Sequence, residues 1–201
     1  MANAAFLRLG DEYVRAECQD NPGFATALGV HEVDGELPDL SQEARDAMVR
    51  TYRRFLQRLE EFAEAELDRE EQLQRELLQR RIQWRIASIE ELRPHITDPA
   101  LVLNELGRAL QSLMVRDFAP LPERVHSLIS RVRQAPRLFA QARATLERPS
   151  RIHTETALER LAGLRRLLAD EVPPFLAKAG DALARDGAAA LEPVLQALDS
   201  Y

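Results

Sequence analysis

Residues 21–41 read NPGFATALGVHEVDGELPDLS and separate two long helical patterns, so the rest of the chain is organised around this stretch. Pro22 disfavours helical geometry at the residue before it, and the preceding helix is therefore expected to end near Asn21. One short helical turn should follow, closed by Gly29, because glycine tolerates the left-handed backbone of a helix end. The glycine, proline and acidic residues from Val30 to Leu40 predict an ordered loop.

A long helical hairpin is expected after this loop. No glycine or proline interrupts residues 41–93, which could form a single helix of about 75 Å. Asp68 with Glu71 has the pattern of a capping box, however, and predicts a new helix start and hence two antiparallel arms. The side chains expected to meet between the arms are Met48, Tyr52, Phe55 and Leu59 on the first, and Leu73, Leu77, Ile82 and Ile86 on the second. Trp84 is expected to pack on the apolar side of the second arm.

Shorter helical patterns precede and follow the hairpin, and none has the alternation of a β-strand. The N-terminal pattern is Phe6, Leu9, Tyr13 and Val14, with Asn3 as the N-cap. The expected breaks after the hairpin lie at Pro94, Asp98-Pro99, Pro120, Pro122, Pro136, Pro149, Pro173-Pro174 and Gly187. Pro136 should end or kink its element, leaving a short helix beyond it. We predict an all-α fold of about seven to nine helices, as one module with sub-regions 1–40, 41–93 and 94–201.

Composition and charge exclude several classes of protein. Only 5% of residues are aromatic, so the core must be built from Leu, Ala, Ile and Val. The net charge of −6 repels phosphate, which argues against nucleic acid as a partner. The single cysteine, Cys18, excludes an intrachain disulfide and is expected to be a packed thiol. No membrane-spanning stretch or signal peptide is visible, so we expect a cytoplasmic chain or one that has lost its targeting segment.

The histidines do not have the spacing of a helical zinc site, which needs two of them one turn apart with a glutamate beside the first. The four are His31, His95, His126 and His153. A distributed site made by His31, Asp34 and a distant histidine is one hypothesis, and the alternative is that the pair only caps the loop. We assign no catalytic, cofactor-binding or metal-ligating residue from the sequence and expect no cofactor.

Four features together resemble a bacterial family catalogued as domain of unknown function 885. They are FATALGVHEVDGELPDLS (24–41), the acidic and arginine-rich hairpin, the helix ending in Asp117-Phe118 before two prolines, and RVRQAPRLFAQARATLERPSRIHTETALERL (131–161). The resemblance runs from about Tyr13 to the C-terminus and concerns the N-terminal part of that family. Its full-length members resemble large, all-helical, zinc-dependent peptidases whose zinc motif lies downstream. That motif has no counterpart here, so none of the family's catalytic residues maps onto this chain.

The resemblance implies a non-catalytic module equivalent to the N-terminal portion of a metallopeptidase-like protein, with a structural or cleft-forming role. The chain would then be an N-terminal fragment, an expressed domain or a free-standing relative of that region. Its expected partner is the C-terminal catalytic part of the same protein. The alternative is a free-standing interaction protein that dimerises through the hairpin, and a third is an enzyme in its own right. Nucleic acid and membranes are not expected as partners.

Overall fold

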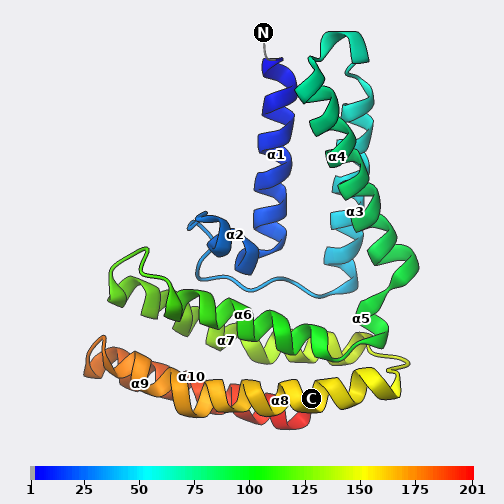
Figure 1. Ribbon diagram of the computed structural model, residues 1–201. Helices are drawn as coiled ribbons and strands as arrows, with labels where there is room; N and C mark the ends of the chain where they lie inside the picture. Colours follow the sequence, from blue (N-terminus) through cyan, green and yellow to red (C-terminus); the bar gives the residue numbers. More distant parts are fainter. Residues whose placement is uncertain (1–2) are drawn as a thin grey trace. The chain divides into compact units, whose positions relative to one another are not determined.

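The computed structural model describes residues 3–201, and this part of the chain is helical, without a strand (Figure 1). The α-helices are α1 (Ala4–Asp20), α2 (Pro22–Leu28), α3 (Gln42–Glu60), α4 (Arg69–Ala87), α5 (Pro94–Thr97), α6 (Ala100–Val115), α7 (Leu121–Thr145), α8 (Arg151–Arg166), α9 (Val172–Ala177) and α10 (Asp181–Ser200). A 3-10 turn, η1 (Glu64–Glu66), and two π-turns, η2 (Ser88–Leu92) and η3 (Leu167–Glu171), lie between them. Within residues 3–201, eight α-helices have seven residues or more, so the predicted all-α fold is confirmed. No helix in this range is both long and apolar enough to cross a lipid bilayer.

The chain forms two compact units. Of the described residues, the hairpin unit contains residues 3–20 and Ser41–Pro94, and the bundle unit contains Asn21–Leu40 and His95–Tyr201. The first forty residues therefore contribute to both units, although the sequence suggested that they form one sub-region. The organisation of the chain as a single module stays a prediction.

The hairpin unit is built from α1 and the antiparallel pair α3 and α4 (Figure 1). Ser41 caps α3, its hydroxyl accepting a hydrogen bond from the amide of Ala44 at 3.2 Å. At the start of α4 the Asp68 carboxylate accepts from the amide of Glu71, and the Glu71 carboxylate accepts from the amide of Asp68, both at 3.0 Å. This reciprocal capping box fixes the start of α4, so the second arm begins where the sequence predicts.

The core of the hairpin unit is aromatic at its centre. The Tyr13 ring meets the Phe55 ring edge-on, with the ring centroids 5.5 Å apart. The buried members of this core are Phe6, Leu9, Tyr13, Tyr52, Phe55, Leu59, Leu67 and Ile82, and Met48 and Ile86 pack against them.

The prediction of which α4 side chains face the core is partly wrong. Leu73, Leu77 and Trp84 are 57%, 58% and 59% exposed, because they lie on the side of α4 opposite the buried Ile82. Val14 of α1 is likewise exposed. A pattern of apolar residues on two faces gives no sign of which face the neighbouring helices cover.

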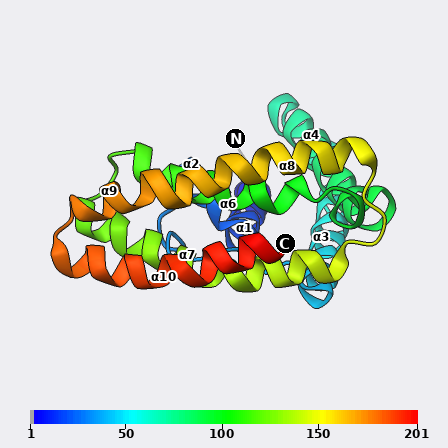
Figure 2. The same ribbon diagram turned by 90° about the horizontal axis from the view of Figure 1, so that it is seen from below.

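The bundle unit consists mainly of α6, α7, α8 and α10, which alternate in direction along the chain. Figure 2 shows α8 and α10 running antiparallel and joined through α9 at one end. Leucine, valine and alanine fill the centre, as the composition predicts. Its fully buried leucines and valines include Leu106, Leu110, Leu113, Val125, Leu128, Leu138, Leu168, Val172, Val194 and Leu198.

Two predicted helix boundaries in the bundle unit are wrong. Helix α7 continues through Pro136, so no separate short helix follows it. Helix α10 likewise continues through Gly187, which the sequence suggested as a break. A Cβ atom at Gly187 would lie 2.3 Å from Leu176 Cδ1, so the glycine is there for close packing of α9 on α10.

Candidate functional site

The candidate site begins at α2, whose ends form as the sequence predicts. The side chain of Asn21 accepts a hydrogen bond from the amide of Phe24 at 3.0 Å, and Pro22 is the first helical residue. Gly29 ends the helix with a φ angle of 87°, in the left-handed region. The chain that follows, Val30 to Leu40, is an ordered loop, which we name the anchored loop.

Polar side chains on one face of α7 bind the backbone of the anchored loop. Gln134 accepts from the amide of Leu37 at 3.1 Å and donates to the carbonyl oxygen of Gly35 at 2.7 Å. Gln141 accepts from the amide of Leu40 at 3.0 Å. Gln134 and Gln141 are seven residues apart, which places them two turns apart on the same side of the helix. The helix therefore fixes the conformation of a loop that has no ladder of its own backbone bonds.

Arg131 is the centre of this anchorage and is fully buried. Its guanidinium donates, at 2.5 to 3.4 Å, to the carbonyl oxygens of Pro22, Glu36 and Ala109 and to the hydroxyls of Thr26 and Ser112. Burial lowers the pKa of Arg131 to about 10, and the carboxylate of Asp34 opposes that change. Arg131 is therefore still charged at neutral pH, and one side chain ties together α2, the anchored loop and α6.

Thr26 links Arg131 to a histidine and aspartate pair in the anchored loop. The Thr26 hydroxyl accepts from Arg131 at 2.8 Å and lies 2.5 Å from Asp34 Oδ1, to which it donates. The other carboxylate oxygen of Asp34 is 2.9 Å from His31 Nδ1. The Asp34 side chain is 9% exposed and that of His31 is 38% exposed, so the pair runs from the interior to the surface.

The pair can orient an imidazole for chemistry. An ionised Asp34 only accepts hydrogen bonds, so Nδ1 of His31 donates and Nε2 of the neutral ring is left as an acceptor. The ring also stacks on Phe118, with centroids 4.0 Å apart and the planes at 10°. A histidine held in this way can accept a proton from a ligand or serve as a ligand to a metal ion.

A distributed metal site was one hypothesis for this pair. The structure brings His31 and Asp34 together, but no third metal-binding side chain joins them. Within residues 3–201, no group of three or more His, Cys, Asp and Glu side chains is arranged to hold a metal ion. His153 instead lies with Nδ1 3.1 Å from the carbonyl oxygen of Thr97. The hydrogen bonds of the pair join side chains to one another, His31 to Asp34 and Asp34 to Thr26, so the loop-capping alternative stays a prediction.

A second polar cluster, in the hairpin unit, was not foreseen from the sequence. Glu17 is buried; it accepts from the Tyr52 hydroxyl at 2.5 Å and from Arg81 and Arg85 at 2.8 and 3.2 Å. Burial favours a raised pKa for Glu17, but the hydrogen bonds from Tyr52 and Arg81 leave it below the ordinary value. Burial also raises the pKa of Tyr52. Cys18, next to Glu17, is buried, as expected for a packed thiol.

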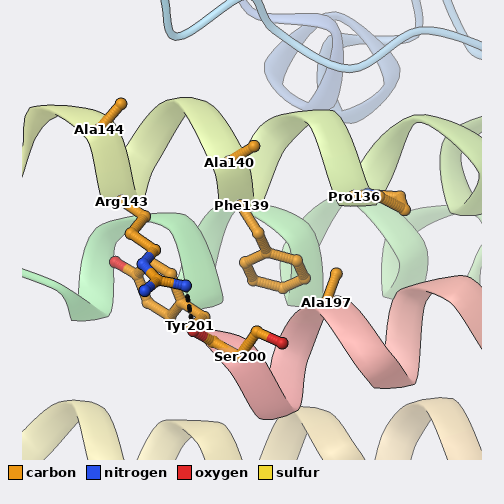
Figure 3. Close-up of a pocket in the computed structure, with 8 residues that line it drawn as sticks. All are labelled: Pro136, Phe139, Ala140, Arg143, Ala144, Ala197, Ser200 and Tyr201. Carbon is orange, nitrogen blue, oxygen red and sulfur yellow. Dashed lines mark hydrogen bonds between the residues drawn. The ribbon is translucent and has the colours of Figure 1, made fainter.

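An open groove of about 490 Å³ lies between α7 and α10 in the bundle unit (Figure 3). Its lining residues are Pro136, Phe139, Ala140, Arg143, Ala144, Ala197, Ser200 and Tyr201. Arg143 donates to the carbonyl oxygen of Ser200 at 2.9 Å, and the Phe139 and Tyr201 rings lie 5.5 Å apart. Burial raises the pKa of Tyr201 to about 12. The groove is mostly apolar, and the titratable side chains in its lining are Arg143 and Tyr201, so the anchored loop remains the better candidate site.

Comparison with known proteins gives a family but no activity. The sequence matches a family described as "Bacterial protein of unknown function (DUF885)" over residues 22–201. This range contains the anchored loop and the whole of α7. None of the curated proteins matches the chain.

A similar solved structure comes from Shewanella oneidensis and is described as "a putative lipoprotein of unknown function". The two chains are 22% identical and superpose with a TM-score of 0.89. The match covers 98% of this chain and 36% of that one. At this identity the likeness shows the fold alone, and this chain spans little more than a third of the length of the other.

Proposed function

The chain belongs to DUF885, a bacterial family of unknown function, and we propose that it acts as a non-catalytic helical module. In this proposal it is equivalent to the N-terminal portion of a larger metallopeptidase-like protein in the cytoplasm. There it packs against the catalytic part and forms a wall of its cleft. The observation that carries the proposal is that nearly the whole chain has the fold of only 36% of a longer protein.

The use of polar side chains supports a structural role. Arg131 directs its donors to carbonyl oxygens and hydroxyls, and Gln134 and Gln141 bind loop amides. These groups are therefore committed to holding the anchored loop in one conformation. In a cleft wall, such a loop would present the oriented imidazole of His31 to a ligand held mainly by another part of the protein.

Two measurements on the purified chain test the non-catalytic proposal. Elemental analysis should find no stoichiometric zinc, and a mixture of unstructured peptides should remain uncleaved. About one zinc per chain, or cleavage that is lost on adding a chelator, would overturn it. A catalytic zinc usually has three fixed protein ligands, so either result would require ligands that the sequence does not suggest.

The DNA that encodes the chain tests whether the chain is part of a larger protein. A reading frame that continues beyond Tyr201 to a His-Glu-x-x-His motif supports the proposal. A natural stop codon after Tyr201, with no partner of that kind encoded nearby, favours the second candidate. That candidate is a free-standing helical protein that associates through its hairpin, and the exposed Leu73, Leu77 and Trp84 on α4 favour it.

A further inference from the structure

Helix α4 is apolar on two opposite faces, and the core of the hairpin unit covers one of them. Ile82 is fully buried on the inner face. Leu73, Leu77 and Trp84 follow the outer face at spacings of four and seven residues, within about 40° of one another around the helix axis. Each is more than half exposed. We refer to these three residues as the outer stripe.

We propose that the outer stripe is the surface through which two copies of this chain associate. In this arrangement α4 of one copy packs antiparallel against α4 of the other, about a two-fold axis close to residue 75. The proposal rests on the second candidate function, association through the hairpin, and deepens it by naming the face and the register of the pairing.

Charge complementarity favours a second copy as the occupant. Glu70 and Arg81 lie on the same flank of the outer stripe, eleven residues apart, so they are separated by about three turns. A two-fold antiparallel helix pair brings equal flanks together. Glu70 of one copy then meets Arg81 of the other, twice, when the axis passes between residues 75 and 76. The Arg81 side chain is 52% exposed, and its five N–H donors allow a second carboxylate beside Glu17.

The same register also brings the apolar side chains together. Leu73 and Leu77 lie on either side of residue 75, so the leucines of both copies interdigitate at the centre. On the other flank, Glu76 lies near its own counterpart, but each copy's Arg80 is 2.5 Å from its Glu76 and reduces the repulsion.

Trp84 lies about 13 Å from the axis in this register, opposite the turn end of the other copy's hairpin. An open hollow of about 710 Å³ adjoins Leu73 on the flank of α4 that carries Glu76. It is lined by Glu64, Arg69, Glu70, Gln72, Leu73, Arg75, Glu76 and Gln79. A single pair of helices is a small interface, so we expect a dissociation constant of about 1–100 μM.

Trp84 is the only tryptophan of the chain, so its fluorescence reports directly on the outer stripe. Sedimentation velocity should show a monomer–dimer equilibrium, and the emission of Trp84 should shift to shorter wavelength over the same concentration range. Leu77→Glu should raise the dissociation constant at least tenfold and keep the emission at the wavelength of an exposed indole. If Leu77→Glu loses the circular dichroism signal of a helical protein, Leu73→Ser takes its place as the test variant.

The matched control is Leu158→Glu, which puts the same charge on an equally exposed leucine of α8, 62% exposed in the bundle unit. It should leave the dissociation constant within about twofold, because this face takes no part in the proposed pairing. Glu70→Arg should weaken the dimer several-fold and reduce its dependence on salt. A strict monomer at about 1 mM, a dimer without a change in Trp84 emission, or equal weakening by Leu158→Glu would each overturn the proposal. None of these outcomes bears on the zinc and cleavage tests.

Discussion

Replacing Arg131 by methionine should destabilise the bundle unit by about 3–5 kcal/mol. Methionine approximates the volume of the side chain but removes the donor to five acceptors, and each buried acceptor that is left without a partner costs about 1–3 kcal/mol. The five acceptors of Arg131 do not all lose their last partner. Ala109 O still accepts from the Ser112 hydroxyl at 3.0 Å, whereas Glu36 O depends on Arg131. The expected loss is therefore less than the sum of five separate hydrogen bonds, yet it is a large part of the roughly 5–15 kcal/mol that stabilise a typical domain.

Urea denaturation followed by far-UV circular dichroism measures this loss, and hydrogen exchange of residues 30–41 locates it. The amides of Leu37 and Leu40 should exchange faster in the variant, because the loop that Gln134 and Gln141 bind is no longer anchored. The double variant Asp34→Asn with Arg131→Met should lose less free energy of unfolding than the sum of the losses of the two single variants, by about 1–3 kcal/mol. Arg133→Met is the control, since the ion pair of Arg133 with Asp186 is exposed, and it should cost less than about 1 kcal/mol. A loss below about 1 kcal/mol for Arg131→Met would refute the view that this residue anchors the loop.

Further tests concern the hairpin unit, whose unfolding can be followed by hydrogen exchange of the backbone amides of α3 and α4. Phe55→Ala should lower the free energy of unfolding by about 3–5 kcal/mol because the ring is buried against Tyr13. Leu73→Ala should lower it by less than about 1 kcal/mol because its side chain is exposed. Similar losses for both variants would contradict the observed packing of α3 against α4. The pKa of Glu17 is lowered in the folded state from an ordinary value of 4.5, so its contribution to stability is present above that value and is lost as the pH falls through the folded pKa. Acid titration should therefore destabilise the wild type below about pH 4.5 more steeply than Glu17→Gln, and identical acid profiles would show that the Glu17 cluster contributes nothing to this dependence.

Short-range signals in the sequence determined most of the helices. Ser41, Asp68 and Gly29 act through atoms of their own or neighbouring residues, so their caps form wherever the chain goes afterwards. The all-α class followed from the same local patterns. The resemblance to DUF885 is confirmed by the family match over residues 22–201.

Predictions from local patterns were wrong at positions where a residue distant in the sequence decides the helix boundary or the buried face. Pro136 removes one hydrogen bond, but the packing of α7 on both sides keeps the helix continuous. Gly187 looked like a break, and only the approach of Leu176 shows why a residue without a side chain is needed there. Leu73 and Leu77 have the same spacing as core residues, and the sequence does not record that α1 and α3 cover the opposite face of α4.

The candidate site was visible in the sequence only in part. His31 and Asp34 are three residues apart, so their pairing is a local property of the loop. Arg131 lies 97 residues beyond Asp34, and the local pattern of α7 does not show which of its arginines are buried; Arg124 of the same helix is buried as well. Tertiary structure alone brings it to Thr26, because a charge can be buried only where distant carbonyl and hydroxyl groups converge on it. The sequence therefore determined which segments are helical, and the tertiary structure decided which polar groups those helices enclose and which apolar face of α4 stays exposed.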